Sequence, residues 1–163
     1  MRFTLEQRFD APPDAVAAAY ADPGLYAAFA ELPRAGRPEV LHHEIAEDTV
    51  HLDVRWAFTA PLSSAARAVI DPDRLTWVER SAHHLADRSV TWRLLPDNYA
   101  DRFTCHGTYH FDDDGRAGTV RRSDGELRVK APLVARTVER AILDGLGEQL
   151  AAEVPLVERY LKR

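Results

Sequence analysis

Histidines are the residues of this chain with the most obvious capacity for metal chemistry. The sequence has seven of them, with adjacent pairs at positions 42–43 and 83–84. Neighbours on a strand point to opposite faces, so neither pair can hold one ion between its two rings. His106 and His110 would share a face, but a strand separates them by ~13 Å. No cysteine, aspartate or glutamate spacing supports a metal site, so we expect none and interpret the histidines as surface or edge residues.

Cys105 is the single cysteine of the chain and its one thiol nucleophile. It lies inside a predicted strand, where alternation turns the adjacent His106, the obvious activating base, to the opposite face. We therefore interpret Cys105 as a buried, unreactive thiol. One cysteine also excludes an intrachain disulfide, which fits a reducing compartment.

An acidic run at positions 112–114, followed by Gly115, superficially resembles a calcium loop. It lacks the alternating ligands and the glutamate six residues after the glycine that an EF-hand requires. The run instead predicts a solvated hairpin turn. The sequence contains no glycine-rich phosphate loop.

Polar side chains that strand alternation places among apolar ones are the stronger site candidates. Arg121 and Ser123 share a predicted strand face with Leu127, and Glu79 shares another with Trp77. A buried charge is costly unless it is paired, so an inward Arg121 or Glu79 would need the other or a polar ligand group. A few convergent polar groups in an apolar cleft orient a small-molecule guest. A bulge that shifts the register would instead place both charges in solvent.

Aromatic and aliphatic side chains supply the apolar part of the same expected lining. Such stripes are ordinarily core, and they line a pocket only where the facing helix stands off from the sheet. The complete expected lining is Trp56, Phe58, Trp77, Glu79, Trp92, Phe103, Tyr109, Arg121, Ser123, Ile142 and Leu146.

The elements that would position these residues follow from hydrophobic periodicity. Residues 2–9 alternate as a half-buried strand, which a proline pair ends before a helix over 13–20. Asp22 and Pro23 predict the start of a second short helix that reaches residue 32. Six further strands are predicted at 39–46, 50–58, 74–82, 87–95, 101–111 and 118–130. Their short connections predict antiparallel neighbours.

A long helix is predicted after Pro132, because the apolar period changes there from two to four residues. It would cover some 30 residues, or ~45 Å. A strict four-residue row winds around the helix axis, which suits a helix lying across a twisted, curved sheet. Gly145 and Gly147 lower its propensity, and Pro155 is expected to kink or break it. The row consists of Val134, Val138, Ile142, Leu146, Leu150 and Val154.

Composition is that of a soluble globular protein. The 163 residues, 45% of them hydrophobic and 29% charged, predict one domain over residues 1–163. The net charge of −5 argues against nucleic acid and against anionic membrane surfaces as partners. No apolar run is long enough to span a bilayer, and the N-terminal stretch lacks the apolar core of a signal peptide. We expect a cytoplasmic location.

The order strand, two short helices, six strands, long helix resembles the helix-grip domains of the START-like (SRPBCC) superfamily. That superfamily includes lipid-transfer domains, plant pollen-allergen-type proteins and polyketide cyclases. The resemblance rests on FTLEQRFDAP at 3–12, Asp22–Pro23, and GELRVKAPLV at 125–134. The last segment, with residues 137–139, resembles a branch catalogued as domain of unknown function 2505.

This resemblance implies an α+β helix-grip fold, with a curved antiparallel sheet of six to seven strands around the long C-terminal helix. It also implies a deep cavity that holds a hydrophobic or amphipathic small molecule. We therefore expect binding or carriage of a lipid-like or polyketide-like molecule, with no cofactor, metal or catalytic residue.

Two other functions stay open at this point. A cyclase or dehydratase type of enzyme would need an acid or base facing the cavity, and Glu79, Arg121 and Tyr109 are the candidates. A ligand-free protein-interaction module would instead need a filled interior and an exposed apolar patch. We rank binding first, the enzyme second and the interaction module third.

Overall fold

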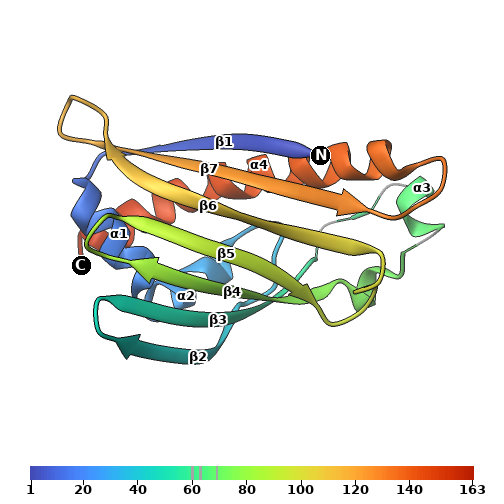
Figure 1. Ribbon diagram of the computed structural model, residues 1–163, viewed down its shortest axis with the longest axis horizontal. Helices are drawn as coiled ribbons and strands as arrows, with labels where there is room; N and C mark the ends of the chain where they lie inside the picture. Colours follow the sequence, from blue (N-terminus) through green and yellow to red (C-terminus); the bar gives the residue numbers. More distant parts are fainter. Residues whose placement is uncertain (60, 63, 69) are drawn as a thin grey trace.

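The computed structural model describes residues 1–59, 61–62, 64–68 and 70–163, and one curved antiparallel sheet is its framework (Figure 1). The sheet has seven strands in the order β1-β7-β6-β5-β4-β3-β2. From β2 to β7, strands that follow one another along the chain lie side by side, as their short connections predict. The strands are β1 (Arg2–Phe9), β2 (Glu39–Ala46), β3 (Thr49–Ala57), β4 (Thr76–His84), β5 (Ser89–Pro96), β6 (Phe103–Asp113) and β7 (Thr119–Val129).

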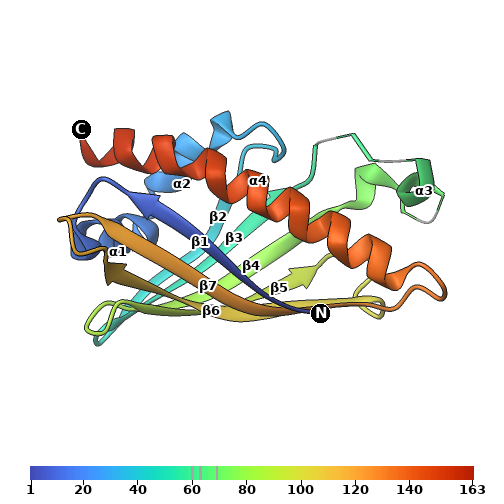
Figure 2. The ribbon, with the colours of Figure 1, turned by 90° about the horizontal axis from the view of Figure 1, so that it is seen from above.

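The helices lie on the concave side of the sheet. Figure 2 shows α4 crossing the sheet obliquely, with its C-terminal end beside α2. It packs most closely against β1, β7, α1 and α2. The helices are α1 (Pro13–Ala21), α2 (Leu25–Ala28), α3 (Ser64–Arg67) and α4 (Ala135–Leu161), with short 3-10 helices at Phe29–Glu31 and Pro72–Arg74. None of the helices within the described ranges is long and apolar enough to cross a membrane.

Several element boundaries differ from those that the sequence predicts. The second short helix begins at Leu25 and ends as a 3-10 turn, because the Asp22 carboxylate accepts a hydrogen bond from the Gly24 amide instead of capping a helix at Pro23. Strands β4, β5 and β6 each begin two residues later than predicted. Helix α3 and the 3-10 helix before β4 are not predicted by the sequence, since three or four residues are too few to show a period.

Helix α4 is continuous over 27 residues and contains Pro155 in its interior. Of the two outcomes expected for Pro155, a kink or a break, the break does not occur. Proline removes the hydrogen bond to the carbonyl four residues earlier, here that of Ala151. Both residues are exposed, so water can satisfy that carbonyl and the helix continues.

Two glycines allow the sheet to bend beneath its aromatic side chains. Gly107 of β6 lies opposite Gly125 of β7. A Cβ atom on Gly107 would lie 2.2 Å from the Asp124 carbonyl oxygen, and one on Gly125 would lie 2.4 Å from the Phe3 ring. The rings of Phe3 and Trp92, with centroids 6.4 Å apart, therefore pack over a surface that no side chain obstructs.

The packed core lies at the end of the molecule where α1, α2 and the C-terminal half of α4 meet β3 and β6. Burial of large apolar side chains there is the main stabilising contribution. Its fully buried members include Phe9, Val16, Leu25, Phe29, Leu52, Val54, Phe111 and Val157.

Candidate functional site

The register of the sheet places the predicted polar residues on its concave face. Glu79 lies opposite Val54, and Arg121 lies opposite Phe111. Directly opposed residues share a face, and both Val54 and Phe111 are only 1% exposed beneath the helices. The register shift that the structure shows falls between β2 and β3, so it does not turn Glu79 or Arg121 into solvent.

The predicted lining residues divide into a buried and a half-buried group. Phe58 follows the end of β3 and pairs through an isolated bridge with Ala35. The buried group is Trp56, Tyr109, Arg121 and Ser123. The half-buried group is Phe58, Trp77, Glu79, Trp92, Phe103, Ile142 and Leu146.

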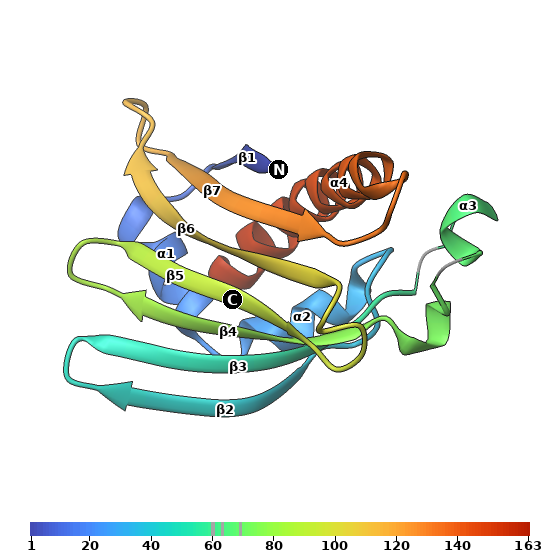
Figure 3. The same cartoon turned by 45° about the vertical axis from the view of Figure 1, so that its right-hand side comes forward.

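The half-buried group borders the space between the sheet and the N-terminal half of α4. Glu139, Leu150 and Glu153 are buried on the sheet-facing stripe of α4. Ile142 and Leu146 fall on this stripe at helical spacing, yet they remain accessible. Figure 3 shows this half of α4 beside β7, and β5 and β4 follow β6 farther along the sheet. Accessible apolar side chains are therefore present both on the concave face of the sheet and on the helix.

Glu79 is the titratable group on the wall of this space. It points inward and stays partly accessible, although burial is the largest cause that raises its pKa to about 7. The charge of Arg121 opposes this increase, and that of Glu153 adds to it. Desolvation favours the neutral form of a carboxyl group, which is the direction of this shift. Among the described residues Glu79 has no hydrogen-bond or ion-pair partner.

Arg121 lies in a buried cluster that α4 completes. Its Nη1 donates to Gln7 Oε1 at 2.8 Å and lies 3.3 Å from Glu153 Oε2. The same Glu153 oxygen accepts a hydrogen bond of 2.9 Å from the Tyr20 hydroxyl. The guanidinium carbon also lies 3.9 Å from the centroid of the Tyr109 ring and 4.3 Å from that of Tyr20.

Of the partners expected for Arg121, Glu79 is not the one found, because its ion-pair partner within the described residues is Glu153. Burial raises the pKa of Glu153, while Arg121 and Tyr20 oppose the increase. Burial alone would lower the pKa of Arg121, but Tyr20, Tyr109 and the nearby carboxyl groups outweigh it, and this pKa is raised. Sequence reasoning missed Gln7, Tyr20 and Glu153. The available signal was a charge on the apolar stripe of α4 and a glutamine on the apolar face of β1.

His83 and Ser81 continue the inward face of β4 beyond Glu79. Ser81 Oγ lies 2.9 Å from His83 Nε2, and His83 is 1% exposed. The expectation of a surface or edge position is therefore wrong for this histidine. Burial, with a smaller contribution from Arg121, lowers the pKa of His83 to about 3, so the imidazole is neutral near pH ~7.

Cys105 is buried on the concave face, as the sequence indicates. Burial raises the pKa of its thiol to about 12, and the charge of Glu79 adds to the effect. The thiol is therefore protonated and a poor nucleophile. Within the part of the chain that the structure describes, no three His, Cys, Asp or Glu side chains are placed to hold a metal ion.

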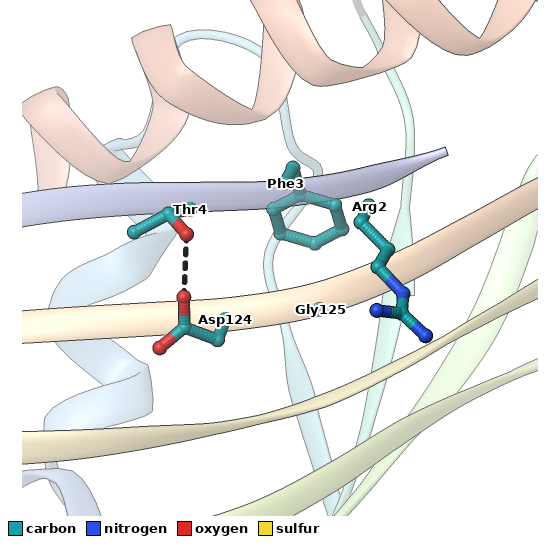
Figure 4. Close-up of a pocket in the computed structure, with 5 residues that line it drawn as sticks. All are labelled: Arg2, Phe3, Thr4, Asp124 and Gly125. Carbon is teal, nitrogen blue, oxygen red and sulfur yellow. Dashed lines mark hydrogen bonds between the residues drawn. The ribbon is translucent and has the colours of Figure 1, made fainter.

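Two shallow depressions also lie on the outside of the sheet, away from the predicted lining. One lies at the β1–β7 edge, where the Thr4 hydroxyl donates to Asp124 (Figure 4). The other lies over β2, β3 and β4, where Arg80 forms a bidentate salt bridge with Asp53. The predicted apolar and polar lining residues are on the concave face instead.

Solved structures of other proteins share this architecture over nearly its full length. TTHA0849 from Thermus thermophilus is 16% identical, with a TM-score of 0.71, over 99% of this chain and 97% of that one. The Zhui aromatase/cyclase from Streptomyces sp. R1128 is 18% identical, with a TM-score of 0.62, over 100% and 94%. Norcoclaurine synthase from Thalictrum flavum is 20% identical, with a TM-score of 0.61, over 100% and 87%.

These similarities show the helix-grip α+β fold alone. No curated protein matches the chain in sequence. Residues 4–161 match the family described as "Protein of unknown function (DUF2505)", and the chain therefore belongs to this family.

Proposed function

We propose that the protein binds a small hydrophobic or amphipathic molecule between the concave face of the sheet and the N-terminal half of α4. The observation that carries this proposal is the half-burial of apolar side chains on both walls. Trp77 and Trp92 on the concave face of the sheet, and Ile142 and Leu146 on the sheet-facing stripe of α4, all keep accessible surface. A guest that covers these surfaces would gain a binding free energy of ~25 cal/mol for each Å² of apolar area it buries.

The comparisons support a small organic guest. The aromatase/cyclase and norcoclaurine synthase structures come from proteins with small-molecule chemistry, and one norcoclaurine synthase variant is in complex with a transition-state analogue. The same fold in this chain carries an apolar lining with a few inward polar groups. A ligand-free interaction module would need a filled interior, so the accessible lining counts against that alternative.

The first experiment is native mass spectrometry of the freshly purified protein, followed by organic extraction of any bound molecule. A stoichiometric hydrophobic guest supports the proposal and gives its chemical class. A neutral fluorescent reporter, N-phenyl-1-naphthylamine, then measures binding to protein freed of that guest.

A matched pair of substitutions on β5 locates the reporter. Leu94 faces Glu79 and Cys105 across the concave face, whereas Leu95 of the same strand points to the convex face. Leu94→Trp should fill the space and weaken reporter binding by about tenfold, a difference of about 1.4 kcal/mol. Leu95→Trp should leave it unchanged. Equal affinities in both variants, or no reporter binding with a clean apo mass, would contradict the proposal.

An enzyme of cyclase or dehydratase type is the second candidate, and one observation favours it. The pKa of Glu79 is raised to about 7, and such a group on an apolar wall serves general acid–base chemistry near neutral pH. Turnover of labile polyketide mimics should then be lost in Glu79→Gln and reduced in Tyr109→Phe. Equal rates in the wild type and both variants would exclude this role for the two residues.

A further inference from the structure

Glu79 is the inward charge for which the described part of the chain supplies no partner. It projects from the middle of β4 between Val54 of β3 and Leu94 of β5, both apolar. A carboxylate in such surroundings is costly unless it accepts hydrogen bonds. Its accessible surface borders the space in which the guest is proposed to bind. A guest bound in that space could therefore supply the hydrogen-bond donor that Glu79 lacks.

The cation that would attract an anionic guest is held at Nη1 by partners within the protein, while its buried Nε has no partner among the described residues. Arg121 is 6% exposed, and its Nη1 is held by Gln7 and Glu153. Tyr20 and Tyr109 cover the guanidinium group with their rings. A guest carboxylate would have to displace the buried Glu153 and leave that charge unpaired, which is strongly unfavourable. It would also approach Glu79, a charge of the same sign.

We propose that the guest carries a head group that donates hydrogen bonds, an amine or a hydroxyl and not a carboxylate, and that Glu79 receives this group. The inference rests on the proposed binding function and specifies its ligand class. Glu79 accepts from the ammonium or hydroxyl hydrogen, and the apolar part of the guest lies against Trp77 and Trp92 on the same wall. The Arg121–Glu153 pair stays intact and forms the closed end of the site.

The pH dependence of this recognition follows from the groups that face Glu79. The charge of Arg121 favours the ionised carboxyl, Glu153 disfavours it, and burial raises the pKa to about 7. The amine affinity should therefore increase as the pH rises through this value, because ammonium groups remain protonated there. The titratable and charged neighbours are Arg121 of β7, Glu153 of α4, Tyr26 of α2, and Cys105 and Tyr109 of β6.

The test is competition for N-phenyl-1-naphthylamine by three molecules with one chain length and different head groups: decylamine, decanol and decanoate. At about pH 8, decylamine and decanol should displace the reporter, and decanoate should be at least about tenfold weaker. Glu79→Gln should weaken decylamine about tenfold and decanol less than about threefold. It should also abolish the gain in amine affinity between about pH 6 and pH 8. Glu44→Gln, at an exposed position of β2, is the control and should behave as the wild type.

Three results would overturn the head-group assignment while the binding function stands. These are displacement by decanoate as strong as by decylamine, an unchanged decylamine affinity in Glu79→Gln, and reporter binding that none of the three competitors reverses. Failure of the reporter itself to bind is different, because it removes the binding function and the head-group assignment with it.

Discussion

Glu79 and Arg121 lie within electrostatic reach of one another, but their surroundings differ. Arg121 has a hydrogen-bonded carboxylate, an amide oxygen and two aromatic faces, all from the protein. Glu79 has apolar neighbours on both sides and a pKa raised to about 7. Within the described part of the chain, the protein thus supplies hydrogen-bond partners to Nη1 of one buried charge, although its Nε has none, and supplies no partner to the other. Perturbed groups of the second kind are typical of functional sites.

The stability of the protein should depend on pH through Glu79. Its pKa is raised from 4.5 to about 7 on folding, so folding favours the protonated form. The resulting stability is fully present below pH 4.5 and is lost as the pH rises through about 7. Glu79→Gln should therefore increase the free energy of unfolding at about pH 8 by on the order of 1 to 3 kcal/mol.

Urea denaturation of the wild type and Glu79→Gln at several pH values measures this difference. The two free energies of unfolding should converge below pH 4.5, where Glu79 is protonated in both the folded and the unfolded chain. Glu44→Gln is again the control. A difference between wild type and Glu79→Gln that does not change with pH would show that Glu79 ionises normally in the folded protein.

Residue positions on strands could be predicted more reliably than their partners. The two-residue period of a strand places Glu79, Arg121 and Ser123 inward without knowledge of the rest of the fold. The partners Gln7, Tyr20 and Glu153 come from β1, α1 and α4, and contacts among distant elements are not encoded in local spacing. The surface position expected for His83 is wrong, because that expectation considered the adjacent histidines only as metal ligands and did not apply the strand period to them. The strand period alone gives His83 the face of Glu79 and Ser81.

At the scale of elements, the Arg121–Glu153 pair joins α4 to the sheet. Gln7 supports the same junction, since its side-chain amide also donates to the carbonyl of Leu150. The pair therefore fixes the height of α4 above β7 and β1 at the centre of the helix. The C-terminal half of α4 is packed beyond this point, and the N-terminal half is the wall of the proposed site.

Removal of one partner of this pair should destabilise the protein strongly. Glu153→Leu leaves Arg121 charged and buried without a carboxylate, a change that costs about 3 to 5 kcal/mol. Arg121→Met likewise leaves the buried Glu153 carboxylate without its cationic partner. The double variant Arg121→Met/Glu153→Leu replaces the pair by apolar groups and should recover most of the loss.

A double-mutant cycle by urea denaturation measures this coupling. The expected result is a double variant that is more stable than either single variant. A double variant whose loss equals the sum of the two single losses would show that the two side chains do not interact. In that case the position of α4 would depend on its apolar contacts alone.

The glycines of α4 and of β6 should respond in opposite ways to alanine. A Cβ atom on Gly145 would meet nothing within 4 Å, and one on Gly147 would lie 3.9 Å from Leu5. Gly145→Ala and Gly147→Ala should each stabilise the helix by about 0.5 to 1 kcal/mol. Gly107→Ala places its Cβ atom 2.2 Å from a backbone oxygen and should destabilise the sheet. Thermal unfolding measures all three, and a loss of stability in Gly145→Ala would mean that this position needs a glycine for another reason.

Long elements with a sustained period could be predicted, and short ones could not. The apolar row of α4 and the alternation of β3 are sufficient for both elements. Helix α3 has four residues and shows no period. The start of β4 is set by Asp71, whose carboxylate accepts from the Asp73 amide and caps a 3-10 turn. Pro155 does not break α4, because the cost of a helical proline depends on whether the freed carbonyl reaches water.

At the scale of the whole molecule, the helix-grip fold has a packed end and an accessible end. The packed end holds the aromatic and aliphatic core between α1, α2, β3 and β6. The accessible end holds the half-buried residues of β4, β5 and the N-terminal half of α4. The order of elements is enough to predict this fold. The identity of the guest is set by a few side chains, which structures at 16–20% identity do not share by necessity.

The two ends should also differ in local stability, and a guest should reduce that difference. Residues 135–149 of α4 bury few side chains, whereas residues 150–157 include Leu150, Glu153, Leu156 and Val157 in buried positions. Segments with few buried contacts open at lower free energy than packed ones. Amides of the N-terminal half should therefore exchange with deuterium at least about tenfold faster than those of the C-terminal half.

Saturating decylamine should slow exchange in residues 135–149 and in β4 and β5, because the guest fills the space between them and stabilises the closed arrangement. Exchange in β2, which lies at the far edge of the sheet, should not change. Hydrogen–deuterium exchange followed by mass spectrometry measures both effects, and Leu94→Trp is the control in which a given subsaturating decylamine concentration should protect these segments less. Uniform exchange along α4 in the free protein would contradict the difference between the two ends. Protection confined to β1 and β7 would place the guest in the depression at their edge, outside the grip of the helix.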